Sequence, residues 1–155
     1  MRRNRATKRP LTPDPVYNNA LVSRLINSVM ERGKKGAARK IVYAAFDIIK
    51  ERIKKDPLQV FDQAITNVSP NLELKARRIG GANYQIPIEV NQQRKLALSM
   101  RWILEGAASR KGMKRALGLA NELIEASQKT GHAMKKREDT HRMAEANKAF
   151  AHFAW

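Results

Sequence analysis

The sequence predicts a mainly α-helical fold: a bundle of about six helices with one protruding β-hairpin, approximately residues 72–90, and a disordered basic N-terminal arm. Apolar residues recur at helical spacing through most of the chain, and in one segment they alternate with polar residues instead. The first 17 residues show neither pattern. A chain of 155 residues fits one domain over residues 1–155, with an extended arm at 1–17 and the bundle with its hairpin at 18–155.

Three helices are predicted before the hairpin. The first ends at Gly33 and the second follows Gly36, and in both the apolar residues form a stripe at helical spacing. The third has a clear start, because Asp56 is a good N-cap and Pro57 suits the first helical position. It stops at Ser69–Pro70, since the residue before a proline avoids helical backbone.

The segment from Leu72 to Val90 is predicted to form two strands, because apolar residues alternate with polar ones on both sides of a glycine-rich turn. Pro87 is compatible with this, since both strands of a two-stranded ribbon are edges. Strands of about eight residues span roughly 25 Å, whereas a globule of this length has a radius of gyration of about 15 Å. The tip, Arg78 to Tyr84, is therefore expected to project beyond the core.

Three more helices follow the hairpin. Asn91 is the expected N-cap of the fourth, and the fifth carries an apolar stripe from Leu117 to Ile124. The sixth begins near His132 and is expected to run through Phe150 and Phe153 towards the C-terminus.

Positive charge dominates the composition. Lys and Arg outnumber Asp and Glu by 31 to 14, which gives a net charge of +17. Such a chain repels itself when compact, and a polyanion that accepts many contacts and releases its counterions relieves this repulsion. The cations cluster near residues 2–9, 33–36, 75–78, 110–115 and 135–137. Nucleic acid is therefore the expected partner.

Other classes of function find no support in the sequence. The chain has no cysteine, which excludes disulfides, thiol nucleophiles and cysteine-based zinc sites. Its histidines, His132, His141 and His152, match no common metal-ligand spacing, and no serine lies in a nucleophile-elbow context. The longest apolar run, residues 41–46, is far shorter than a membrane helix. We expect a cytoplasmic protein that is not an enzyme, with no metal, cofactor, small-molecule substrate or membrane partner.

Two basic turns each admit two interpretations. In Gly33-Lys34-Lys35-Gly36 the glycines let both lysines approach phosphates closely, but a solvated helix C-cap has the same composition. On the hairpin, the arginines and Tyr84 suit a groove or a splayed base, whereas the alternative is a charged edge that blocks aggregation. We favour nucleic-acid contact at both turns.

A cationic stripe is predicted on the sixth helix. Its members fall within roughly 60° of one another at about 100° per residue: Arg137, His141, Lys148 and His152. The stripe suits a nucleic-acid backbone, and the alternative is an ordinary solvated face.

Three stretches of the chain resemble one family. Residues 14–17, leading to Gly33-Lys34-Lys35, resemble the N-terminal signature of bacterial small-subunit ribosomal protein seven, and residues 76–90 are similar to its hairpin. Residues 135–153 resemble its C-terminal helix nearly residue for residue. The similarity covers essentially the whole chain.

This resemblance implies a structural constituent of the small ribosomal subunit: a primary rRNA-binding protein that nucleates assembly of the head domain, at the subunit interface near the decoding region and the exit-site tRNA. The implied partners are small-subunit rRNA, exit-site tRNA and mRNA, and small-subunit ribosomal proteins nine and eleven. The residues expected at rRNA are Arg2, Arg3, Arg5, Lys8, Arg9, Lys34, Lys35, Lys75, Arg77, Arg78, Arg94, Lys95, Arg101, Arg110, Lys111, Lys114 and Arg115. Those expected to face tRNA and mRNA are Gly80, Gly81, Ala82, Asn83, Tyr84, Lys135, Lys136, Arg137, His141 and Arg142.

Two other functions are open at this point. An architectural DNA-binding protein would carry the same charge and use the hairpin as a clamp, but it would need apolar wedge residues at the tip. An RNA-modifying enzyme would need a cofactor loop or paired acid–base residues, and the sequence shows neither.

Overall fold

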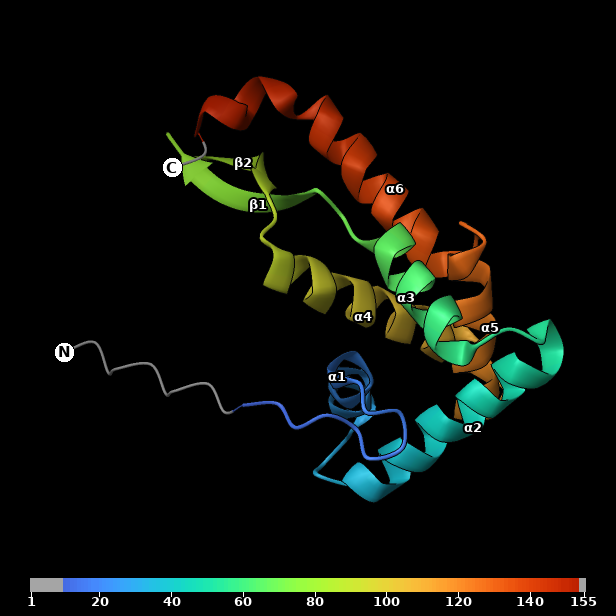
Figure 1. Cartoon of the computed structure of the whole chain (residues 1–155). Helices are drawn as coiled ribbons and strands as arrows, with labels where there is room; N and C mark the ends of the chain where they lie inside the picture. Colours follow the sequence, from blue (N-terminus) through green and yellow to red (C-terminus); the bar gives the residue numbers. More distant parts are fainter. Residues whose placement is uncertain (1–9, 154–155) are drawn as a thin grey trace.

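The computed structural model describes residues 10–153 and confirms the mainly α-helical fold with one antiparallel hairpin (Figure 1). In chain order its elements are α1 (Ala20–Val29), α2 (Lys35–Ile53), α3 (Pro57–Val68), β1 (Leu72–Ile79), β2 (Ala82–Glu89), α4 (Gln92–Ser109), α5 (Arg115–Ser127), α6 (Gly131–Ala146) and the 3-10 helix η1 (Lys148–Phe153). Across residues 10–153 no helix is both long and apolar enough to cross a membrane.

Side-chain caps fix where three of the helices begin. Asn19, Asp56 and Asn91 each accept a hydrogen bond from a backbone N–H in the first turn of the helix that follows. Pro57 comes directly after its cap, where its missing N–H costs nothing. The predicted caps Asp56 and Asn91, and the predicted end of α3 at Ser69, are thus confirmed.

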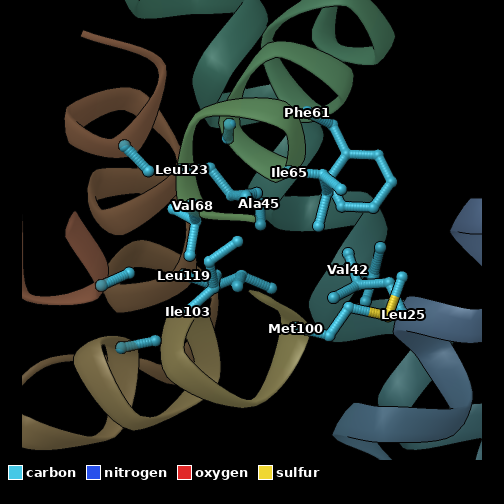
Figure 2. Close-up of a cluster of buried hydrophobic side chains, with 14 of the residues drawn as sticks. Leu25, Val42, Ala45, Phe61, Ile65, Val68, Met100, Ile103, Leu119 and Leu123 are labelled. Atoms are coloured by element: carbon cyan, nitrogen blue, oxygen red, sulfur yellow. The ribbon is translucent and has the colours of Figure 1, made fainter. Parts of the chain in front are cut away.

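The core forms where α5 packs against α2, α3 and α4, and the buried side chains of these helices meet there (Figure 2). Phe46 and Phe61 are completely buried, with ring centroids 5.9 Å apart. Burying one such side chain contributes about 1.5–3 kcal/mol to stability. Trp102 is 9% exposed and belongs to the same cluster, so it is a core residue.

The hairpin pairs in one uninterrupted register, from Leu72 opposite Glu89 to Ile79 opposite Ala82. Its turn is Gly80–Gly81, with φ values of 57° and 92° that glycine adopts at little steric cost. In Figure 1 the hairpin extends away from the bundle, and α6 and η1 run alongside it. We call this unit of β1, β2, α6 and η1 the hairpin arm.

Aromatic rings hold the hairpin and the C-terminal segment together. The ring centroid of Tyr84 lies 5.0 Å from that of Phe150 and 6.2 Å from that of Phe153. The predicted sixth helix is interrupted here, because α6 ends at Ala146 and a 3-10 helix continues. With three residues per turn, a 3-10 helix brings residues three apart to the same side. Both phenylalanines therefore face Tyr84, which one continuous α-helix would not achieve as well.

The connection between α1 and α2 also differs from the prediction. α1 ends at Val29, four residues before Gly33, because Met30 adopts extended backbone. Arg32 and Gly33 then turn the chain with positive φ values of 52° and 76°. α2 begins at Lys35, before Gly36 rather than after it.

The folded body starts earlier than predicted. Asp14, expected in the arm, is 2% exposed. Its carboxylate accepts hydrogen bonds from the N–H groups of Val16 and Tyr17 and from the hydroxyl of Tyr43. Burial, together with this bond, raises the pKa of Tyr43. Residues 14–17 are therefore fixed to α2, and only 10–13 of the described residues precede this anchor.

Candidate nucleic-acid interface

A groove with a volume of about 1020 Å³ runs between α1, α2, α4 and α5. Half-buried apolar side chains lie along it, Val29 from α1, Ile41 from α2 and Leu104 from α4. Its exposed cations are Arg24, Lys34, Arg101 and Arg115. The groove thus combines an apolar floor with a basic rim, although these residues are far apart in the sequence.

The rim keeps an excess of positive charge. Its four cations face two carboxylates, Glu31 and Glu105. Arg115 approaches Glu31 at 3.7 Å, but the two side chains are 61% and 83% exposed. An ion pair this exposed is worth little, because water and salt screen it. The cations of the rim therefore remain available to an anionic ligand.

The lysine turn lies at one end of this groove, and its position contradicts the C-cap interpretation. Lys34 is the N-cap of α2 and Lys35 is its first residue, and both side chains are exposed. Lysines here face the positive end of the helix dipole, which disfavours them by a few tenths of a kcal/mol, about 0.3–1. A helical preference does not explain these lysines, so contact with an anion is the better interpretation.

Two cations at the start of α4 bind side chains at the base of the hairpin. Arg94 pairs with Glu73 at 3.0 Å, and Lys95 donates to the side-chain oxygen of Asn71 at 2.8 Å. These bonds tie the start of α4 to β1. The two residues therefore fasten the base of the hairpin, and their predicted rRNA contact is untested.

The side chains of the hairpin differ in their exposure to solvent. Lys75 and Arg78 are exposed, whereas Arg77 is half-buried opposite Tyr84 in the strand register. Tyr84 is half-buried against Phe150, so that ring face is not free to stack on a base. The turn residues Gly80, Gly81, Ala82 and Asn83 are all exposed.

The predicted stripe on the sixth helix does not form as one solvated cationic face. Arg137 and His141 are half-buried, and Nε2 of His141 accepts a hydrogen bond from the backbone N–H of Asn71 at 3.1 Å. Burial, reinforced by Arg137 and Lys95, lowers the pKa of His141, so the ring is neutral at pH 7. Two further members, Lys148 and His152, belong to η1 rather than α6.

The exposed cations of α6 lie on another face of the helix. Lys135, Lys136 and Arg142 are exposed, and Arg142 also pairs with Asp139 on the next turn. These three residues are the part of the predicted tRNA-facing set of α6 that a ligand can reach from solvent.

Arg110 is held inside the protein as well. Its guanidinium binds Glu125 at 2.6 Å and Glu122 at 3.0 Å. The bond to Glu125, partly opposed by burial, raises the pKa of Arg110. Its neighbours Lys111 and Lys114 are exposed. Arg110 is therefore engaged within the protein, whereas the rRNA contact of the two lysines stays a prediction.

The N-terminal cations lie outside the described residues: Arg2, Arg3, Arg5, Lys8 and Arg9. Arg24 on the groove rim was not predicted, because it is isolated in the sequence and belongs to no basic cluster. The sequence feature that could have identified Arg24 is its position on α1 away from the apolar stripe.

No other kind of site is apparent in residues 10–153. That part of the chain holds no group of three His, Cys, Asp or Glu residues placed to bind a metal ion. A second hollow, beside Tyr17 and the start of α3, has a volume of about 660 Å³ and combines three lysines with two aspartates, so its excess of positive charge is smaller than that of the groove rim.

Comparison with known proteins agrees with this geometry. The family model described as Ribosomal protein S7p/S5e matches residues 1–148. Small ribosomal subunit protein uS7 of Thermotoga neapolitana is 59% identical over 155 residues, and the match covers all of both chains. The proteins of the same name from Mycoplasma pneumoniae and Mesoplasma florum are 57% and 54% identical, again over the full length of both chains.

Proposed function

The chain belongs to the ribosomal protein S7p/S5e family and is a structural, RNA-binding constituent of the small ribosomal subunit. From this premise we propose that it is a primary rRNA-binding protein that nucleates assembly of the subunit head. Like its ribosomal relatives, it acts in translation as a structural protein and not as an enzyme. We further propose that it lies at the subunit interface, near the decoding region.

The groove between α1, α2, α4 and α5 is the observation that carries this proposal. A duplex backbone would use only its basic rim, because it offers phosphates and sugars but no bases to an apolar floor. Unpaired nucleotides use both, since their bases pack on apolar surface while their phosphates meet cations. We therefore assign the groove to a non-duplex segment of rRNA, with Arg24, Lys34, Arg101 and Arg115 at the phosphates.

The hairpin arm is proposed to face a different set of partners. The exposed tip of the hairpin, Gly80 to Asn83, lies at the end of the two strands that points away from the bundle (Figure 1), and α6 adds exposed cations beside the hairpin. Exit-site tRNA and mRNA are the partners that the family resemblance implies here, together with small-subunit ribosomal proteins nine and eleven. Lys135, Lys136 and Arg142 are the proposed contacts on α6.

The two rival functions are weaker. A DNA-bending clamp needs an apolar wedge at its tip, and the turn of this hairpin consists of Gly80, Gly81, Ala82 and Asn83. An RNA-modifying enzyme needs paired acid–base groups enclosed in a cleft, whereas the ion pair along the groove, Arg115 with Glu31 at 3.7 Å, is largely exposed to solvent.

A charge reversal with a matched control tests the proposal. Arg101→Glu on the groove rim should weaken binding to a small-subunit rRNA head fragment by about 10- to 100-fold. Lys50→Glu, equally exposed but at the far end of α2, should change the affinity much less. Equal losses in both variants would show that binding follows net charge alone. A DNA duplex that binds as tightly as the rRNA fragment would favour the clamp instead.

A further inference from the structure

The helix that carries the proposed tRNA-facing cations is not capped by its own sequence. α6 begins after Thr130, whose side chain makes no capping hydrogen bond, and its first turn contains no acidic residue. The N–H groups of a first turn need acceptors, because no preceding helical carbonyl is available to them. For Ala133 that acceptor comes from another helix: its N–H donates to Oε1 of Glu122 on α5 at 2.8 Å.

Glu122 is a completely buried carboxylate that links three helices. It is 0% exposed, and its second oxygen, Oε2, accepts from Arg110 at the end of α4 at 3.0 Å. Burying a carboxylate is costly unless it is paired and hydrogen-bonded, and both conditions hold here. One side chain of α5 therefore contacts the end of α4 and the start of α6 at once.

The backbone of α4 and α6 approaches this carboxylate closely at two glycines. A Cβ at Gly106 on α4 would lie 2.4 Å from the carboxyl carbon of Glu122, and one at Gly131 would lie 3.2 Å from its Oε1. Both positions are glycine, and the φ of Gly131 is +93°. The two helices approach the carboxylate closely because they lack side chains at these points.

We propose that Glu122 is a positioning residue that fixes the direction in which α6 leaves the bundle. A charged oxygen at the N-terminal end of a helix is also favoured by the helix dipole. The far end of α6 leads into η1, where Phe150 and Phe153 pack on Tyr84 of the hairpin. Glu122 thus sets, from the inner end, where the exposed cations of the hairpin arm stand relative to the groove.

The absence of cysteine from the sequence makes a direct test possible. Spin labels at Lys50→Cys on α2 and Lys136→Cys on α6, both exposed positions, report the direction of α6 as a distance distribution. A second pair, Lys50→Cys and Gln63→Cys on α3, reports whether the bundle itself is intact. Glu122→Met removes the acceptor at nearly constant volume, whereas Glu122→Gln keeps an oxygen for the N–H of Ala133.

Glu125→Met is the matched control, because it changes the other carboxylate of Arg110 and a side chain that also lies beside Gly131, but removes no hydrogen bond to the start of α6. We expect Glu122→Met to shift and broaden the α2–α6 distances and to accelerate amide exchange at Ala133 by about tenfold. Glu122→Gln and Glu125→Met should leave the α2–α6 distances and the exchange rate at Ala133 near their wild-type values. The α2–α3 distances should stay unchanged in all three variants. The proposal fails if Glu122→Met leaves α6 in place, if Glu125→Met displaces it equally, or if the α2–α3 pair broadens as well.

Discussion

The groove and the hairpin arm are both rich in Lys and Arg, yet they use these residues differently. Along the groove, the cations stand exposed on helices whose other faces are buried in the core. At the arm, Arg94 of α4 pairs with Glu73 of β1, Arg142 of α6 pairs with Asp139, and His141 accepts a backbone hydrogen bond. Positive residues of the arm thus serve partly to build it. The number of basic residues in a segment is therefore a poor measure of how many cations it leaves free for a ligand.

Neutralising the cations of the groove should weaken rRNA binding more than any other change. Changing Arg24, Lys34, Arg101 and Arg115 together to Gln should weaken rRNA binding by about 100-fold or more and make the salt dependence of log K shallower by about three to four units. The matched change in the arm, Lys135, Lys136 and Arg142 to Gln, should reduce the slope by at most about one unit. Affinities at three salt concentrations measure both. Equal changes in slope would remove the distinction between the two regions.

Removing the aromatic contacts should weaken the arm but not the groove. The double change Phe150→Ala and Phe153→Ala deletes both ring contacts of Tyr84, and edge or offset aromatic pairs contribute about 0.5–1.5 kcal/mol each beyond buried area. We expect about 1–2 kcal/mol less stability in urea unfolding, with faster amide exchange in β2, while rRNA affinity stays within about twofold. A large loss of rRNA affinity would mean that the arm is part of the rRNA site.

The turn at Lys34 and Lys35 tests the groove assignment at a single position. Lys34→Gln with Lys35→Gln should make the salt slope shallower by about one to two units. The free energy of unfolding should stay constant or rise by a few tenths of a kcal/mol, roughly 0.3–1, because two cations leave the positive end of the α2 dipole. An unchanged slope would show that these lysines are merely solvated.

The smallest expected effect concerns pH and lies in the arm. The pKa of His141 is lowered in the folded protein, so the unfolded chain binds a proton more readily. The stability that neutral His141 contributes is therefore complete above its unfolded pKa, about 6.5, and is lost as the pH falls below it. Between pH 7.5 and 5.5 the wild type should lose a few tenths of a kcal/mol, roughly 0.3, more than His141→Asn does. His152→Asn, exposed in η1, should behave like the wild type.

Features with local causes could be predicted from the sequence, and those with distant causes could not. The start of α3 follows from Asp56 and Pro57 alone, and the alternation around Gly80 predicts the hairpin. The groove needs α1, α2, α4 and α5 to meet, which no single segment encodes. The packing of Phe150 on Tyr84 likewise joins residues that are far apart in the chain, and it occurs where α6 gives way to a 3-10 helix.

Lys34 and Lys35, which the sequence places at a turn, are exposed in the structure, and their contact with rRNA stays a prediction. Arg110 lies in an equally basic stretch, but two carboxylates on α5 neutralise it. Their presence opposite Arg110 is a property of how α4 packs on α5. Sequence clusters thus located candidate cations, and tertiary packing decided which of them remain free.

The central position of α5 has a consequence for the order in which the protein becomes competent during synthesis. α1 and α2 emerge first, but α5, which packs against α2, α3 and α4, follows only after residue 114. The groove also draws on Leu119 and Arg115, so it is incomplete until that late segment has left the ribosome. At roughly 5–20 residues per second, the growing chain spends several seconds as a basic polymer before the proposed rRNA groove can form. The proposed contact of the groove with rRNA therefore arises only after α5 has been synthesised, when the bundle can fold around this helix.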